Sequence, residues 1–261
     1  MSNFELVELE PLECELYQVK EILKILLHSI VFQRALGESK LRDAESDLLD
    51  VSYVRCDSDT VCHRVEEYAE SFSAGVEQAS NRSAEQQRRQ LEQQQQQMLL
   101  QQGAAGSSGG SLPRGSMPPD DSKAGDAPAR MHAKICVAFF QRQNRPGAFG
   151  LFRGEEKVVW ERWNLTLSVQ TPAMTPESAA ASIAPVATSA EGRRRDQQQL
   201  SEEIRQRLEV ILTTASSRKE HIPPVDGLGG EAPWFEVTSD SDSVGLLDFL
   251  GRGFGRLPRA Y

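Results

Sequence analysis

The sequence predicts an α+β fold in which three long helices pack on a small, mainly antiparallel sheet with a protruding β-hairpin. Three segments carry apolar residues at helical three- and four-residue steps, and several short segments alternate apolar and polar residues as strands do. Two of these strands flank a turn rich in proline and glycine. With 261 residues, a formal net charge of -9 and only 39% hydrophobic residues, part of the chain is expected to lie outside the core.

The first segment predicts an edge strand followed by a buried helix. Phe4 to Glu10 alternates apolar and acidic residues, and Pro11 ends the strand. Apolar residues then recur at helical spacing from about Glu13 to Leu36, before Gly37. The apolar face is broad, so we expect this helix to be the central core helix. His28 lies within that face and is interpreted as a core or interface histidine with satisfied hydrogen bonds, not as a base.

A charged loop separates this helix from a second strand and helix. Leu49, Val51 and Tyr53 alternate with polar residues, which is typical of a half-buried strand. Aspartates then supply helix-cap residues, and an apolar stripe predicts a helix from about Asp59 to Gln78.

The middle of the chain is of low complexity. Residues from about 80 to 130 are first rich in glutamine and then in glycine, serine and proline, and they offer little to bury. We expect a disordered insertion within one domain that spans residues 1–261; a boundary between two domains is the alternative. A second flexible loop is predicted at about 171–190.

The next two strands form the predicted hairpin. Ile135 to Gln141 is apolar on both faces, which predicts a central strand. In the return strand, Val158 to Val169, the alternation changes phase near Glu161 and Arg162, and this indicates a bulge or a bend. Phe149 and Phe152 lie between the turn-forming residues that connect the strands, so we expect an apolar contact surface at the tip. The alternative is that both rings fold back as a lid over the sheet.

The remainder predicts a third amphipathic helix, which begins near Glu191, and a short strand from Trp234 to Thr238. The basic run Arg193 to Arg195 lies beside glutamines and is interpreted as a solvated helix start. In an acidic chain this does not favour nucleic-acid binding.

The sequence shows no common catalytic spacing, such as a P-loop, a GxSxG elbow or HExxH. Cys62 and His63 are adjacent and would point to different sides of a helix, which argues against zinc. We therefore expect no metal and no other cofactor, and reduced thiols in a cytosolic protein. The N-terminus lacks the zones of a signal peptide, and no run of about 18 apolar residues occurs. An interaction module is favoured over an enzyme.

Four runs narrow this interpretation to a family. They are Leu27-His-Ser-Ile-Val-Phe-Gln-Arg34, Leu49-Asp-Val-Ser-Tyr-Val-Arg55, Phe139-Phe-Gln-Arg142 and Trp160-Glu-Arg-Trp163. With the order of the predicted elements, they resemble the autophagy-related protein 101 family, whose members are HORMA-domain subunits of the autophagy-initiation kinase complex. The resemblance covers most of residues 4–78, 135–169 and 193–238.

The resemblance implies a non-catalytic subunit that pairs with the HORMA domain of autophagy-related protein 13 and stabilises it, in the cytoplasm and at the phagophore assembly site. It also implies that the hairpin loop is a finger that recruits downstream autophagy factors. The family's finger carries a tryptophan and a phenylalanine. This loop has no tryptophan, so Phe149 stands for the tryptophan and Phe152 for the phenylalanine.

Two alternatives concern the same fold and the same tip. One is a HORMA adaptor of the spindle-checkpoint or DNA-repair type, which captures a peptide under a mobile C-terminal safety belt. The other is peripheral membrane contact by the tip, because Arg145 and Arg153 flank it and could meet anionic head groups.

Overall fold

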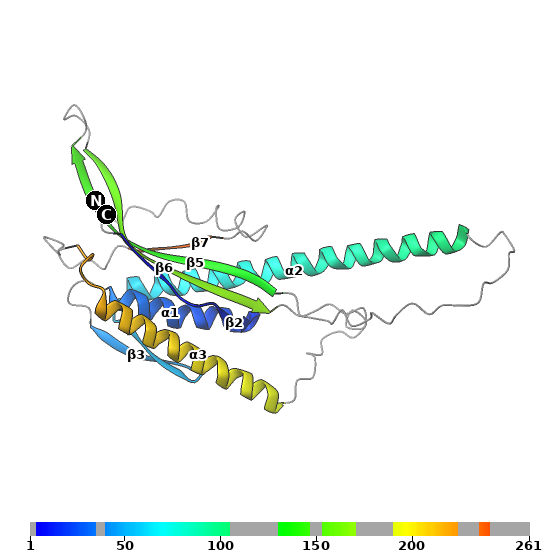
Figure 1. Ribbon diagram of the computed structural model, residues 1–261, viewed down its shortest axis with the longest axis horizontal. Coiled ribbons are helices and arrows are strands. Elements are labelled where there is room, and N and C mark those ends of the chain that lie inside the picture. Colours follow the sequence, from blue (N-terminus) through cyan, green and yellow to red (C-terminus); the bar gives the residue numbers. More distant parts are fainter. Residues whose placement is uncertain are drawn as a thin grey trace.

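The structure is a computed structural model, and it describes residues 4–34, 40–104, 130–146, 153–170, 190–223 and 235–240. Three long helices and two sheets confirm the predicted α+β class (Figure 1). The elements in chain order are β1 (Glu5–Glu8), β2 (Leu12–Glu15), the 3-10 turn η1 (Leu16–Gln18), α1 (Val19–Gln33), β3 (Leu41–Ser46), β4 (Val51–Cys56), α2 (Asp59–Ala104), β5 (Arg130–Pro146), β6 (Arg153–Gln170), α3 (Ala190–Ser217) and β7 (Phe235–Asp240).

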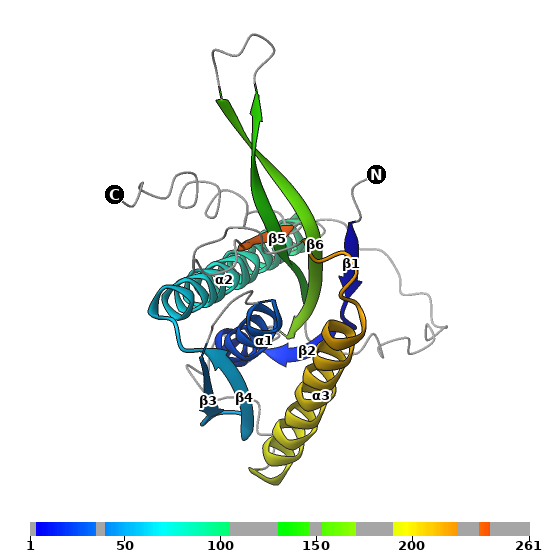
Figure 2. The ribbon, with the colours of Figure 1, turned by 90° about the vertical axis from the view of Figure 1, so that its left-hand side faces the viewer.

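The main sheet has the strand order β1-β6-β5-β7, and β2 also pairs with β6. The ladders β5–β6 and β5–β7 are antiparallel, whereas β1 and β2 run parallel to β6. A separate antiparallel hairpin is formed by β3 and β4. Figure 2 shows α1 between the main sheet and this second hairpin. The prediction of a mainly antiparallel sheet therefore holds, with two short parallel strands added at its N-terminal edge.

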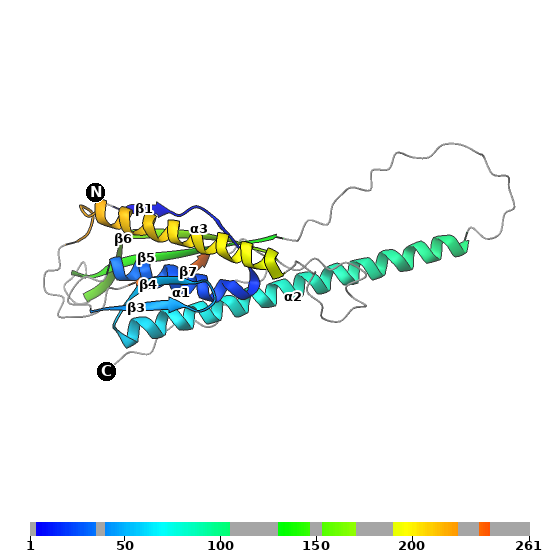
Figure 3. The same cartoon turned by 90° about the horizontal axis from the view of Figure 1, so that it is seen from below.

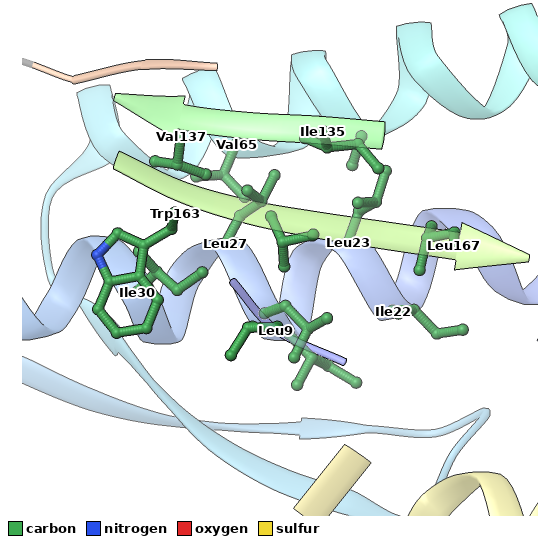
Figure 4. Close-up of a cluster of buried hydrophobic side chains, with 14 of the residues drawn as sticks. Leu9, Ile22, Leu23, Leu27, Ile30, Val65, Ile135, Val137, Trp163 and Leu167 are labelled. Atoms are coloured by element: carbon green, nitrogen blue, oxygen red, sulfur yellow. The ribbon is translucent and has the colours of Figure 1, made fainter. Parts of the chain in front are cut away.

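Helix α1 is the centre of the core, as predicted. Nine of its residues are buried, and it contacts α2, β4 and α3. Figure 4 shows Ile22, Leu23, Leu27 and Ile30 of α1 facing Val65 of α2 and side chains of the main sheet. A helix that meets neighbours on nearly every side needs the broad apolar face that the sequence displays.

The predicted start of this helix at Glu13 is wrong. Residues 12–15 form β2, which pairs with β6 in the register Leu12↔Leu167, and the turn η1 follows before α1 begins at Val19. Leu12 and Cys14 are buried while Glu13 and Glu15 are exposed. This two-residue period is that of a strand, but it is short and runs directly into the helical pattern.

The segment predicted as a charged loop contains β3. Its residues are mostly exposed and charged, and only Ser46 is buried. The strand exists because its backbone pairs with β4 along its whole length. No apolar alternation marks it, and for this reason the sequence did not reveal it.

The glutamine-rich segment also differs from the prediction. Instead of ending near Gln78, α2 continues to Ala104, so residues 80–104 of the predicted insertion are helical. Ion pairs between Glu85 and Arg89 and between Arg88 and Glu92 stabilise this part at helical four-residue spacing. The rest of the predicted insertion, and nearly all of the predicted loop at 171–190, lie outside the described residues.

Helix α3 and strand β7 confirm the last two predicted elements. Three α3 side chains, at four-residue steps, hold the β3–β4 turn: Gln197, Ser201 and Arg205 donate to the carbonyls of Leu48, Leu49 and Asp50. Asp50 has a φ of 47°, a conformation that costs energy for a residue with a Cβ. The α3 contacts offset that cost and attach the small hairpin to the domain.

The interpretation of His28 as a core histidine is confirmed, but the prediction that its ring nitrogens are satisfied is wrong. Its ring is buried and stacks on Tyr53 with the centroids 6.1 Å apart, and neither ring nitrogen has a hydrogen-bond partner within the described part of the chain. Burial, and then the charges of Arg55 and Lys24, lower the pKa of His28 to about 4. The fold therefore holds a neutral imidazole.

We predict that His28 makes the protein sensitive to mild acid. Because its pKa lies below the usual 6.5 in the folded state, the unfolded chain takes up the proton first. The stability from neutral His28 is complete above pH 6.5 and is lost as pH falls toward 4, by about 3 kcal/mol at most. Urea unfolding of wild type and His28→Phe at several pH values between 6.5 and 4 measures this loss of stability. The variant should lose less stability on acidification, the exposed control His63→Gln should follow wild type, and parallel curves for all three would contradict the prediction.

Candidate functional site

The β5–β6 hairpin extends beyond the rest of the main sheet. The two strands pair from Arg130↔Gln170 to Pro146↔Arg153. Strand β7 accompanies β5 only over Lys134–Phe139, and β1 accompanies β6 only over Glu161–Asn164. From these points toward the tip of the hairpin, no third strand among the described residues pairs with β5 or β6. Figure 2 shows this part of the hairpin standing away from the body. A two-stranded ribbon of this kind needs a firm base, because isolated hairpins are marginally stable.

The predicted contact residues Phe149 and Phe152 lie in residues 147–152, outside the described residues. The last described pair before them is Pro146 with Arg153. The structure thus places the base and the two strands of the predicted finger, and the aromatic residues themselves stay a sequence-based prediction.

The predicted bulge lies at the base of the ribbon. Phe139 pairs with Glu161 and Phe140 pairs with Val159, so Trp160 is the extra residue in β6. This confirms the bulge to within one residue of its predicted place. Because of it, the consecutive residues Trp160 and Glu161 are both buried, which a regular strand could not achieve toward one side.

Glu161 forms a buried ion pair with Arg34, the residue that follows α1. Arg34 is 1% exposed and Glu161 0%. The guanidinium donates from Nε to Oε2 and from Nη2 to Oε1, the latter at 3.0 Å. Trp163 donates from Nε1 to Oε1 at 2.7 Å. Two parallel guanidinium bonds and an indole bond give this carboxylate the partners that a buried charge requires.

The same guanidinium also caps α3. Arg34 donates from Nη1 to the carbonyl of Ala215 at 3.0 Å and from Nη2 to the carbonyl of Arg218 at 3.2 Å. These carbonyls lie at the C-terminal end of α3, where a positive charge is stabilised by the helix dipole. One side chain therefore joins α1, the bulge in β6 and the end of α3.

His221, in the segment after α3, packs against this network, and its Nε2 makes no hydrogen bond within the described residues. Its Nε2 lies 3.3 Å from Oε2 of Glu161, and its side chain is buried. Its ring packs against Trp160 at 5.8 Å between centroids, and Trp160 packs against Phe139 at 5.6 Å. Aromatic packing thus seals the ion pair from solvent and fixes the direction in which the ribbon leaves the sheet.

Sequence reasoning missed this network, although a signal existed. Arg34 and Glu161 belong to two of the four runs that carry the family resemblance, and each interrupts an otherwise apolar pattern. Opposite charges in two apolar patterns are candidates for a buried pair. The separation of 127 residues hides their proximity.

Cations lie over aromatic rings on the ribbon and beside its base. Lys157 is 4.1 Å from the centroid of Phe140, and Arg162 is 5.6 Å from that of Phe4. Phe4 and Leu6 of the neighbouring edge are 44% and 45% exposed. Exposed apolar groups beside cations suit contact with another macromolecule better than chemistry on a small substrate.

A shallow groove of about 410 Å³ lies on the first turns of α2 and is lined by Asp59, Cys62, His63, Glu66, Glu67 and Glu70. Across the described ranges, no three histidine, cysteine or carboxylate groups are arranged to hold a metal ion. Within the same ranges, no helix is both long and apolar enough to cross a bilayer.

Breaking the buried pair is predicted to be strongly destabilising. Arg34→Met or Glu161→Gln leaves one buried charge without its counterpart, which should cost about 3–5 kcal/mol. The double variant should cost less than the sum of the two, because neither charge remains. Chemical denaturation of all four proteins measures the coupling. Glu70→Gln, which breaks the exposed pair with Lys20, is the control and should cost at most about 1 kcal/mol. Losses in the single variants no larger than in this control would contradict the prediction.

Comparison with known proteins agrees with the resemblance carried by the four runs. A family model described as autophagy-related protein 101 matches residues 11–227. Autophagy-related protein 101 of Arabidopsis thaliana is 23% identical over 255 residues, which cover 96% of this chain and 94% of that protein. The matched region includes α1, the whole β5–β6 hairpin and every residue of the buried network. The chain belongs to the autophagy-related protein 101 family, and its role is in autophagy.

Proposed function

We propose that this protein is a non-catalytic adaptor subunit of the autophagy-initiation kinase complex, built on a HORMA domain. Membership of the family supports this function, as does a candidate site that offers exposed apolar and cationic surface. The protein acts in the cytoplasm and at the phagophore assembly site, and it pairs with the HORMA domain of autophagy-related protein 13, which it stabilises.

The hairpin is the part that recruits downstream autophagy factors. The observation that carries this proposal is a two-stranded ribbon that extends past its neighbours and is anchored by the buried Arg34–Glu161 pair. Its connecting residues include Phe149 and Phe152. A few aromatic side chains often supply most of the binding energy of an interface, and a rigid base reduces the entropy lost when they bind.

We predict that Phe149→Ala combined with Phe152→Ala abolishes recruitment while the fold and the HORMA pairing persist. Co-precipitation from cells followed by mass spectrometry measures both kinds of partner, and thermal unfolding measures the fold. The matched control is Tyr17→Ala, which removes an exposed ring on the turn η1, outside the ribbon, and should leave recruitment unchanged.

Two outcomes would contradict the finger. Loss of solubility or of the HORMA partner in the double variant would assign Phe149 and Phe152 to the core. Unchanged recruitment would show that the downstream factors bind to another surface of the protein. Membrane contact by the tip is tested with the same proteins: flotation with anionic liposomes that depends on the two phenylalanines would favour a bilayer as the partner.

The safety-belt alternative depends on β7, because this strand would have to leave β5 to enclose a peptide. Phe235 of β7 is buried, lies 6.4 Å from Phe139 between ring centroids, and has Arg64 5.8 Å from its ring centroid. Val237 pairs with Val137 in the same ladder. These contacts favour a locked adaptor, which does not exchange between two folded forms.

We therefore expect a single folded monomer species on ion exchange, before and after prolonged incubation. Conformers that differ in a rearranged strand interconvert slowly enough to separate in this way. Two separable monomer peaks with the same mass would contradict the locked state and favour peptide capture.

A further inference from the structure

Helix α2 leaves the body of the molecule after Ser80. Ser80 is buried, whereas the described side chains from Asn81 to Leu100 are exposed apart from partly buried Ala84. Figures 1 and 3 show the helix running on past the main sheet. At 1.5 Å per residue, the part beyond Ser80 extends about 36 Å. A helix of this length is marginal alone in water, and most helices depend on packing.

One face of this free part carries apolar residues at a regular interval. Ala84, Leu91 and Met98 are seven residues apart, and we call them the seam. They continue the stripe of α2 that is buried within the body through Phe72 and Val76. Met98 is 57% exposed. Helices that pack lengthwise on one another carry two apolar positions in each heptad, and the seam supplies one of them.

Four of the five charges in this segment form ion pairs within it. Arg88 pairs with Glu92 at 3.0 Å and Arg89 with Glu85 at 2.7 Å. Residues 81–100 contain three arginines and two glutamates, which give a net charge of +1. The rest of the chain therefore carries a net charge of -10, and the sum is the total of -9. Two copies of this segment can therefore approach without the repulsion that the rest of the acidic surface would impose.

The seam matches its own reversed copy. In an antiparallel pair centred on Leu91, small Ala84 lies level with large Met98 of the second copy, and Leu91 lies level with itself. This is the self-complementary pattern of a two-fold interface. The seam continues the stripe of α2 that faces the body. In a parallel pair, the bodies of both copies would therefore lie at the same end and on the same side of the paired helices, where they would collide. In the antiparallel arrangement the two bodies lie at opposite ends.

We propose that two copies of this chain associate through an antiparallel pair of α2 helices along the seam. Such a pair gives one assembly two β5–β6 hairpins and two copies of every other surface, which raises its avidity for a multivalent partner. The association is independent of the adaptor function, since a chain that fails to pair would still carry its hairpin.

Sedimentation of the full-length chain tests the association. Its weight-average mass should rise toward that of a dimer as the concentration increases to on the order of 100 µM. Leu91→Glu with Met98→Glu places carboxylates on the seam and should weaken association about tenfold or more. The matched control is Leu99→Glu with Leu100→Glu, which adds the same charge to exposed residues off the seam and should associate as wild type does. A monomeric wild type, or equal weakening by both variants, would overturn the proposal.

Disulfide trapping tests the orientation. Under mild oxidation, Leu91→Cys should form a linked dimer by itself, because this position meets its own copy. Ala84→Cys and Met98→Cys should each remain unlinked alone and should link when mixed. The wild type supplies the background from its own cysteines. Efficient linking of Met98→Cys alone would indicate a parallel pair and overturn the antiparallel arrangement.

Discussion

The fold depends on one buried charge pair, Arg34 with Glu161. Burying two charges costs several kcal/mol of desolvation each, and the attraction between them offsets this only when every donor and acceptor is satisfied. Here the carboxylate accepts from Arg34 and Trp163, and the guanidinium also donates to two carbonyls at the end of α3. The pair therefore adds little net stability over an apolar replacement, but it specifies one arrangement of α1, β6 and α3.

That arrangement determines how the hairpin is presented. The bulge at Trp160 turns Glu161 into the core, and the aromatic residues Trp160, Phe139 and His221 enclose it. The ribbon beyond this point has no neighbouring strand among the described residues, so its direction is set at its base. A contact surface on such a ribbon is held by the core of the domain, although it lies outside it. In an adaptor, packing at the base of the ribbon therefore pre-organises the binding site, which reduces the entropy lost on binding.

The sequence predicted those elements whose apolar pattern is long and regular. The faces of α1 and α3, the central strand β5 and the phase change in β6 all appeared where expected, because each buries a periodic set of side chains.

The strand β3 was missed since backbone pairing, not burial, creates it. The extension of α2 was missed because its glutamines bury nothing and are held by local helix propensity and ion pairs. The network at Glu161 was missed since its members are far apart in the chain. Phe149 and Phe152 came from sequence alone and lie outside the described residues.

Native-state hydrogen exchange of wild type and Arg34→Met tests most directly whether one buried pair couples the helical layer to the hairpin. If it does, amides in Phe139–Gln143, in Val159–Trp163 and in the last turn of α3 should lose protection together in the variant. Amides of the β3–β4 hairpin, which α3 holds through Gln197 and Ser201, should change much less. Loss of protection confined to the end of α1, or spread evenly over the whole domain, would contradict this coupling.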